Sequence, residues 1–239
     1  CVGLLLGSIL SPGWDGAHPL GDAAIGTVTA FTVALATTPR NPVAEVHREL
    51  DPLLTQLSTQ ARAIAAALRS NDVPAAGTAV YSMHETDKGL RQLDETLLHV
   101  RRAAVLTRWR RGEDLTAVTT TATEVGHAIR QVRSVARHAW WGLLRKGEPV
   151  PTALPQMLDA LADGVAVLRV KIAHGEKLAD ARPPLICAGG WVGVMRAERL
   201  GLAAVAVAAG AEAAVLNLLV ATGMALGAAD SALRRSGAV

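Results

Sequence analysis

The sequence contains no lysine and no arginine in its first 39 residues. All 24 basic residues lie between Arg40 and Arg235, and the only charged side chains before Arg40 are Asp15 and Asp22. Translocated loops of membrane proteins are poor in Lys and Arg, whereas cytoplasmic loops are rich in them. The charge distribution therefore predicts that residues 1–39 belong to a membrane domain and that the chain is cytoplasmic from about residue 40 onward.

Residues that carry out catalysis or bind metals are also scarce. Aromatic residues make up 3% of the chain, and the two cysteines, Cys1 and Cys187, have no CxxC spacing. The seven histidines form neither HxxxH nor HExxH, and no glycine-rich phosphate loop precedes a helix. His47 and Asp51 would share a helix face, which we interpret as a solvated pair. The sequence therefore predicts no enzyme, no metal site and no cofactor.

The segment from residue 20 to 38 has the length that the core of a bilayer requires. It is rich in threonine and alanine, so we expect it to pack inside a bundle of spans rather than face lipid on all sides. A buried helix of a soluble protein is the alternative interpretation. The apolar residues 1–10 are too few to span a bilayer, and we interpret them as the second half of a helix. We therefore expect a C-terminal fragment that holds one and a half transmembrane helices.

Asp22 would lie in the outer first turn of this span. A carboxylate at a helix start is stabilised by the helix dipole. Ionisable residues at membrane depth are usually functional, however. Asp22 is therefore our candidate for a residue on a transport path.

Beyond residue 40, apolar residues recur at alternating steps of three and four in four stretches, which is typical of amphipathic helices. No stretch alternates with period two, so the sequence predicts an all-α fold with an antiparallel helical bundle over residues 40–182. Pro52 should kink the first helix, and residues 70–74 should form a turn. The stripe residues are Val43, Val46, Leu50, Leu53, Leu57, Ala61, Ile64 and Leu68; Met83, Leu90, Leu93, Leu97, Val100 and Ala104; Leu115, Val118, Ala122, Val125, Ile129, Val132, Ala136 and Ala139; and Leu158, Leu161, Val165, Leu168 and Ile172.

Residues 183–239 are expected to form a third region. The glycine-rich stretch 186–193 predicts a flexible connection, and residues 200–229 predict one apolar helix. Glu212 and Asn217 would lie near the middle of that helix, where burial in lipid is costly. We therefore favour a helix packed against the cytoplasmic bundle, with a second membrane span as the alternative.

Residues 101–146 hold ten basic residues against three acids. Such a surface could contact anionic lipid of the inner leaflet or partner helices, and a solvated basic face is the simpler interpretation. The net charge of +3 is too small to predict a nucleic-acid partner. The candidate residues for contact with lipid or a partner are Arg108, Arg110, Arg111, Arg130, Arg133 and Arg137.

Several stretches resemble the FUSC family, the fusaric-acid-resistance-like or aromatic acid exporter proteins. The motif "LGDAAIGTVTAFTVAL" with its Pro39–Pro42 exit is similar to the last span of family members, and "RRAAVLTRWRR" is similar to the basic end of a long cytoplasmic helix. Residues 201–224 resemble a C-terminal helix of actinobacterial members, which supports a place outside the membrane.

The resemblance implies a multi-pass protein of the inner (plasma) membrane that exports aromatic acids or similar small compounds. It also implies a homo-oligomer assembled through a transmembrane half that this chain lacks, with membrane lipid as the other partner. The cytoplasmic bundle would then serve assembly or regulation. The alternative hypothesis is a membrane-anchored helical scaffold that binds partner helices or anionic lipid.

Overall fold

The structure is a computed structural model that describes residues 26–27, 42–106 and 112–237. The chain divides into two compact units, Cys1–Asn41 and Pro42–Val239. In the first unit, Gly26 and Thr27 are helical, and the rest of the expected span lies outside the described residues. We call Pro42–Val239 the helical unit. Every regular element in the described residues is a helix, which confirms the all-α fold class.

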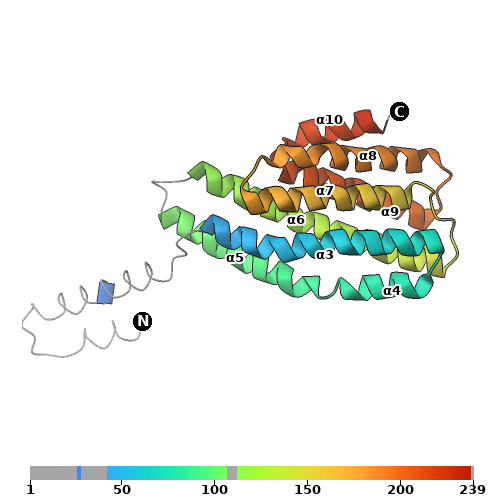
Figure 1. The fold of residues 1–239 in the computed structure, drawn as a ribbon, viewed down its shortest axis with the longest axis horizontal. Coiled ribbons are helices and arrows are strands. Elements are labelled where there is room, and N and C mark those ends of the chain that lie inside the picture. Colours follow the sequence, from blue (N-terminus) through green and yellow to red (C-terminus); the bar gives the residue numbers. More distant parts are fainter. Residues whose placement is uncertain (1–25, 28–41, 107–111, 238–239) are drawn as a thin grey trace, which may run out of the picture. The chain divides into compact units, whose positions relative to one another are not determined.

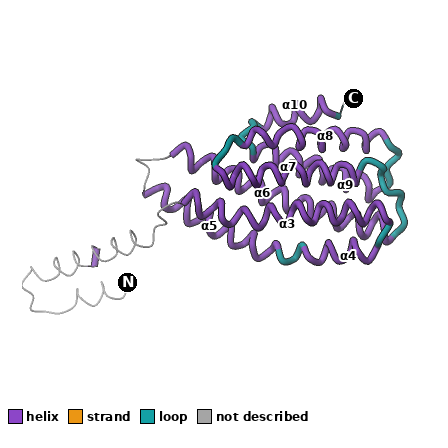
Figure 2. The backbone as a smooth tube through the Cα atoms, in the orientation of Figure 1, coloured by secondary structure: helices purple, strands orange, loops and turns teal. Residues whose placement is uncertain are grey.

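The helices of the helical unit lie lengthwise beside one another, from α4 and α5 at one edge to α10 at the other (Figure 1). The connections between them are short (Figure 2). In chain order the elements are α3 (Pro42–Ser70), α4 (Val73–Ser82), α5 (Thr86–Leu106), α6 (Gly112–His138), the π-helix η1 (Ala139–Arg145), α7 (Leu154–His174), the 3₁₀-helix η2 (Leu178–Ala181), α8 (Arg182–Ala197), α9 (Leu202–Ala221) and α10 (Leu226–Ser236).

The apolar stripes of the sequence form the core. Val43, Leu115 and Val118 are half-buried, and every other stripe residue whose side chain the structure describes is buried. Burying a Leu, Ile or Val side chain fully contributes about 1.5–3 kcal/mol, so these stripes supply a large part of the driving force for folding. The turn expected within 70–74 is formed by Asn71 and Asp72 between α3 and α4. Asn71 adopts a positive φ of 53°, and Asp72 caps α4 by accepting a 2.9 Å hydrogen bond from the backbone N–H of Ala75.

Helices α3 and α7 are antiparallel neighbours joined by ion pairs. Three arginine–aspartate pairs link their exposed edges, and the residue numbers rise along α3 while they fall along α7. Each is a surface pair and contributes at most about 1 kcal/mol, but together they fix the register of the two helices. The pairs are Asp51–Arg169 at 2.7 Å, Arg62–Asp163 at 2.8 Å, and Arg69–Asp159.

Helix α9 makes its most extensive contact with α6, and polar groups from other elements hold its C-terminal end. The last carbonyls of a helix have no partner within the helix. Here the Thr121 hydroxyl of α6 donates to the carbonyl of Ala221 at 2.8 Å. Arg182 of α8 donates to the hydroxyl of Thr222 at 2.9 Å and to its carbonyl at 3.0 Å.

The N-terminal end of α9 is held in the same way. Glu148, in the loop after η1, accepts a 3.1 Å hydrogen bond from the backbone N–H of Ala203. A carboxylate at this position also interacts favourably with the helix dipole. Among the described helices, α9 is the one whose length and composition would allow it to cross a membrane. Half of it is buried inside the helical unit.

The prediction of a flexible connection at 186–193 is wrong, because these residues lie within helix α8. Its glycines allow a neighbouring helix to approach closely. A Cβ atom on Gly189 would lie 2.4 Å from Leu233 of α10, and one on Gly193 would lie 2.3 Å from the backbone of Gly237. Region 183–239 is therefore no separate region but part of the same compact unit.

One helix predicted as continuous is divided in two, and another begins later than its apolar stripe. The apolar helix expected over 200–229 ends at Ala221, and a turn with Gly223 at a φ of 80° leads into α10. The stripe that starts at Met83 begins in a turn between α4 and α5 rather than inside a helix. In contrast, α3 is one continuous helix that contains Pro52.

Candidate functional site

The sequence candidates fall into two groups. Asp22, Arg108, Arg110 and Arg111 lie outside the described residues. Arg130, Arg133 and Arg137 lie on α6, within the helical unit.

Arg130 and Arg133 are paired with acids of the neighbouring helix. The guanidinium of Arg130 lies 3.1 Å from the carboxylate of Asp94, and Arg133 forms an ion pair with Asp87. Both arginines therefore link α6 to α5. Their charges are therefore compensated within the helical unit. This arrangement gives both side chains a structural role along the α5–α6 contact.

Arg137 differs from these two residues. It is exposed, and among the described residues no carboxylate lies within ion-pairing distance of it. Trp141 and Arg145 follow at steps of four, and both are also exposed. Arg137, Trp141 and Arg145 therefore form one stripe on the outer face of the chain where α6 passes into η1.

The π-helix η1 sets the geometry of this stripe. In a π-helix each N–H bonds to the carbonyl five residues earlier, and such turns are frequent at functional sites. The N–H of Lys146 donates to the carbonyl of Trp141 at 3.2 Å in this way. Gly142 on the inner face allows close contact with α9, since a Cβ atom there would lie 2.2 Å from the Cβ of Ala203.

Aromatic rings gather beside this stripe. The ring centroids of Trp140 and Trp141 lie 5.4 Å apart, and Tyr81 of α4 meets Trp140 edge-on at 5.7 Å. The ring of His84 stacks against Tyr81 at 6.2 Å. The Arg145 guanidinium lies 4.3 Å from the centroid of Trp141, close enough for a cation–π interaction. We call Tyr81, His84, Trp140, Trp141 and Arg145 the aromatic cluster.

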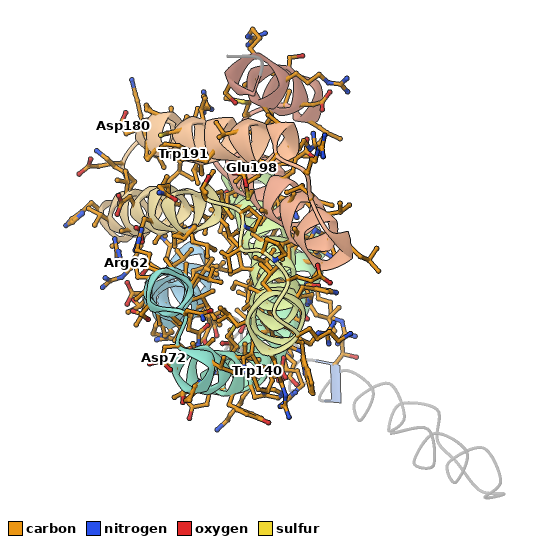
Figure 3. All side chains as sticks on the ribbon, turned by 90° about the vertical axis from the view of Figure 1, so that its right-hand side faces the viewer. Arg62, Asp72, Trp140, Asp180, Trp191 and Glu198 are labelled. Carbon is orange, nitrogen blue, oxygen red and sulfur yellow. The ribbon has the colours of Figure 1, made fainter. Side chains whose placement is uncertain are left out.

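Trp140 anchors the aromatic cluster to the core. Its ring packs against α4 at Gly77, where an added Cβ would lie 3.1 Å from the indole nitrogen. That nitrogen is buried without a hydrogen-bond partner, so packing alone holds the ring. In Figure 3, Trp140 lies beside α4 at one edge of the helical unit, and Trp191 of α8 lies well apart from it. Tyr81 and Trp141, the other Tyr and Trp side chains that the structure describes, belong to the cluster.

A second charged group ties the end of α7 to η2. The ammonium of Lys171 lies 2.6 Å from Glu176 and 2.8 Å from Asp180. Its hydrogen bonds to Asp180 and Glu176 raise the pKa of Lys171, and the same hydrogen bonds lower the pKa values of both carboxyl groups. Gly175, with a φ of 65°, ends α7 and allows this turn.

The expected pair of His47 and Asp51 is replaced by the ion pair of Asp51 with Arg169 at 2.7 Å. Partial burial lowers the pKa of His47. Within the described residues, no group of three or more His, Cys, Asp or Glu side chains is placed to hold a metal ion.

Comparisons of the chain with protein-family models, with curated proteins and with solved structures find no match. The function proposed below therefore depends on the sequence and on the geometry of the helical unit.

Part of the aromatic cluster could be read from the sequence. The four-residue spacing of Arg137, Trp141 and Arg145 is visible there, and so is the adjacent Trp140. The contribution of Tyr81 could not be found in this way, because it depends on how α4 packs against η1.

Proposed function

We propose that the helical unit is the cytoplasmic module of an inner-membrane exporter of the FUSC type, which carries aromatic acids or similar small compounds. The module would serve assembly of the exporter or regulation of its transport path. One observation carries the proposal: the Lys/Arg-free segment of residues 1–39, which contains a stretch of span length, ends where the helical unit begins at Pro42.

The contacts of the helical unit fit a module that assembles or regulates. Its described polar contacts include inter-helix ion pairs, such as Arg133–Asp87, and helix caps, such as Glu148 at α9. Contacts of this kind fix how helices pack. The proposal therefore gives the helical unit no catalytic step and assigns transport to membrane spans, with Asp22 as the candidate residue on the path.

Membrane topology is the first test of this proposal. Single cysteines are introduced within residues 11–18 and within 40–48 of the full-length protein, with Cys1 and Cys187 replaced by serine. We expect the protein to stay in the membrane fraction and the two sites to react with an impermeant maleimide from opposite sides. Labelling of both sites from one side would refute the span and remove the main support for an exporter.

Transport is tested next, in cells that express the complete gene. We expect cells with the gene to tolerate aromatic carboxylic acids at higher concentrations and to lose a preloaded labelled acid faster. The variant Asp22→Asn should lose this export while the protein remains in the membrane. A complete gene that encodes no further hydrophobic spans upstream of this chain would refute the exporter proposal.

A second candidate function is a membrane-anchored scaffold, and one observation favours it. Tyr81 and Trp141 are exposed on the surface of the helical unit, so their rings are available to a partner. Deletion of residues 42–239 separates the two functions. Under the exporter proposal, export is lost or deregulated. Under the scaffold proposal, a membrane-bound partner is lost and efflux does not change.

A further inference from the structure

We propose that Tyr81, Arg137, Trp141 and Arg145 form a docking surface for the anionic phospholipid surface of a membrane. The inference goes beyond the proposed function, because it does not require that residues 20–38 span a bilayer. Without that span, the same surface would bind an anionic membrane peripherally.

The first argument is uncompensated charge. Arg130 and Arg133 are matched by Asp94 and Asp87. In contrast, Arg137, Arg145 and the exposed Lys146 have no carboxylate within ion-pairing distance among the described residues. The nearby acid Glu148 is engaged with the backbone of α9, and Glu85 is exposed next to His84.

This local excess of cations is complementary to lipid phosphates. A Lys or Arg near an anionic membrane surface strengthens binding about fivefold. Arg also presents a planar set of donors that matches the phosphate group. We therefore place the lipid-facing surface at the C-terminal end of α6 and not around Arg130 and Arg133.

The second argument is the exposure of amphipathic rings. Trp141 is 44% exposed, although Trp is highly buried on average, and Tyr81 is 66% exposed. Trp and Tyr favour the boundary between water and hydrocarbon, where an apolar ring and a polar group are both accommodated. Arg145 stacks on Trp141, so a cation for the phosphate and a ring for the interface are held together.

The third argument concerns the class of partner. A groove for single-stranded nucleic acid tracks the phosphates over several nucleotides with a strip of positive charge. Here three cations without an ion pair among the described residues, Arg137, Arg145 and Lys146, lie within ten residues at one end of α6, and the acids of α5 neutralise the arginines before them. Rings beside a small set of cations fit a lipid headgroup region better than an extended polyanion.

The test uses the full-length chain, reconstituted into vesicles whose phosphatidylcholine carries bromine in the acyl chains, with or without phosphatidylglycerol. Bromine quenches tryptophan fluorescence on contact. We expect part of the quenching to depend on phosphatidylglycerol and to decrease as salt rises, because salt screens exposed charges. This part should disappear in Trp141→Phe and persist in Trp191→Phe, since Trp191 lies on another part of the unit.

Charge variants test the same surface. We expect Arg137→Glu with Arg145→Glu to reduce the phosphatidylglycerol-dependent quenching about tenfold or more. The matched control reverses Lys177, in the turn after α7, and Arg235 of α10, two exposed cations for which no ion pair is found within the described residues, and should leave most of the quenching. Circular dichroism should show both double variants to be folded.

Three results would overturn the proposal. The first is quenching of Trp141 that is equal with and without phosphatidylglycerol. The second is an equal loss in both double variants, which would reflect net charge alone. The third comes from a photo-crosslinking amino acid at position 141 in cells: a crosslink to a protein or to RNA instead of lipid would assign the surface to that partner. Resistance of the protein to alkaline extraction from membranes tests separately whether residues 20–38 span the bilayer. Failure of the exporter proposal and failure of the lipid-surface proposal can therefore be distinguished.

Discussion

The hydroxyl of Thr121 on α6 donates a 2.8 Å hydrogen bond to the carbonyl of Ala221, which lies 100 positions later at the end of α9. The bond is buried and satisfies a carbonyl that the helix itself leaves without a partner. It therefore joins the most apolar helix of the unit to the core at a defined register.

Thr121→Val should lower the free energy of unfolding by about 1–3 kcal/mol, because the buried carbonyl of Ala221 loses its donor. Thr121→Ser keeps the hydroxyl and should lose less stability. Urea denaturation of the full chain measures both variants. Equal stability of Thr121→Val and the unmodified protein would mean that α9 does not end against α6 as described.

Gly142→Ala should destabilise the contact between η1 and α9. The added Cβ would lie 2.2 Å from the Cβ of Ala203, so the two helices must separate, at a cost of about 1–3 kcal/mol. Gly227→Ala is the matched control, because nothing lies within 4 Å of its Cβ position. Alanine is also the better helix former there, and stability should be unchanged or higher. Thermal unfolding measures the stability of both variants. If Gly142→Ala and Gly227→Ala changed stability equally, the contact between η1 and α9 would not be as described.

Arg133→Glu should reduce stability by up to about 1 kcal/mol, because it places a second acid beside Asp87. The charge-swapped variant Asp87→Arg with Arg133→Glu should recover most of that loss. A double-mutant cycle from thermal denaturation gives the coupling energy. If Arg133→Glu instead weakens membrane binding and leaves stability unchanged, Arg133 faces lipid, as the sequence analysis predicted.

The lysine–carboxylate group at the end of α7 should make stability depend on pH. Lys171 lowers the pKa values of Glu176 and Asp180, so their contribution is complete above the ordinary carboxyl range and is lost as pH falls below about 4. The pKa of Lys171 itself is raised, so its contribution is complete below its ordinary pKa and is lost only in strong alkali. In Lys171→Met, the free energy of unfolding should fall less between neutral pH and about pH 3 than in the unmodified protein. If Lys171→Met left this pH dependence unchanged, Lys171 would not form the described ion pairs with Glu176 and Asp180.

The periodicity of the sequence predicted part of the core. Stripes such as Val46–Leu68 on α3 and Leu158–Ile172 on α7 are buried as expected, because one apolar face per helix must be removed from water. The stripes contain no information on which helices pair. The partner of Asp51 is Arg169, a contact that spans 118 positions of the chain and has no local signal.

Glycine was the main source of error. Gly189 and Gly193 predicted a flexible connection because glycine lowers helix propensity. In the structure the contact of α8 with α10 needs positions without a side chain, and that packing outweighs the local preference. The π-helix at Ala139–Arg145 was missed because its residues continue the stripe of α6, so the sequence shows no change of period at this point.

The pairing of α3 with α7 and of α6 with α9 also affects how the chain can be synthesised and folded. The two pairs interleave, so neither long helix finds its main partner in the segment that follows it. A chain that leaves the ribosome from its N-terminus would expose the face of α6 that packs against α9 until α9 emerges. Contacts that are so distant in sequence form slowly. A nascent chain stopped at Ala197 would keep α3 and α7 but leave the α9-facing side of α6 uncovered, and we expect it to depend on chaperones or to aggregate.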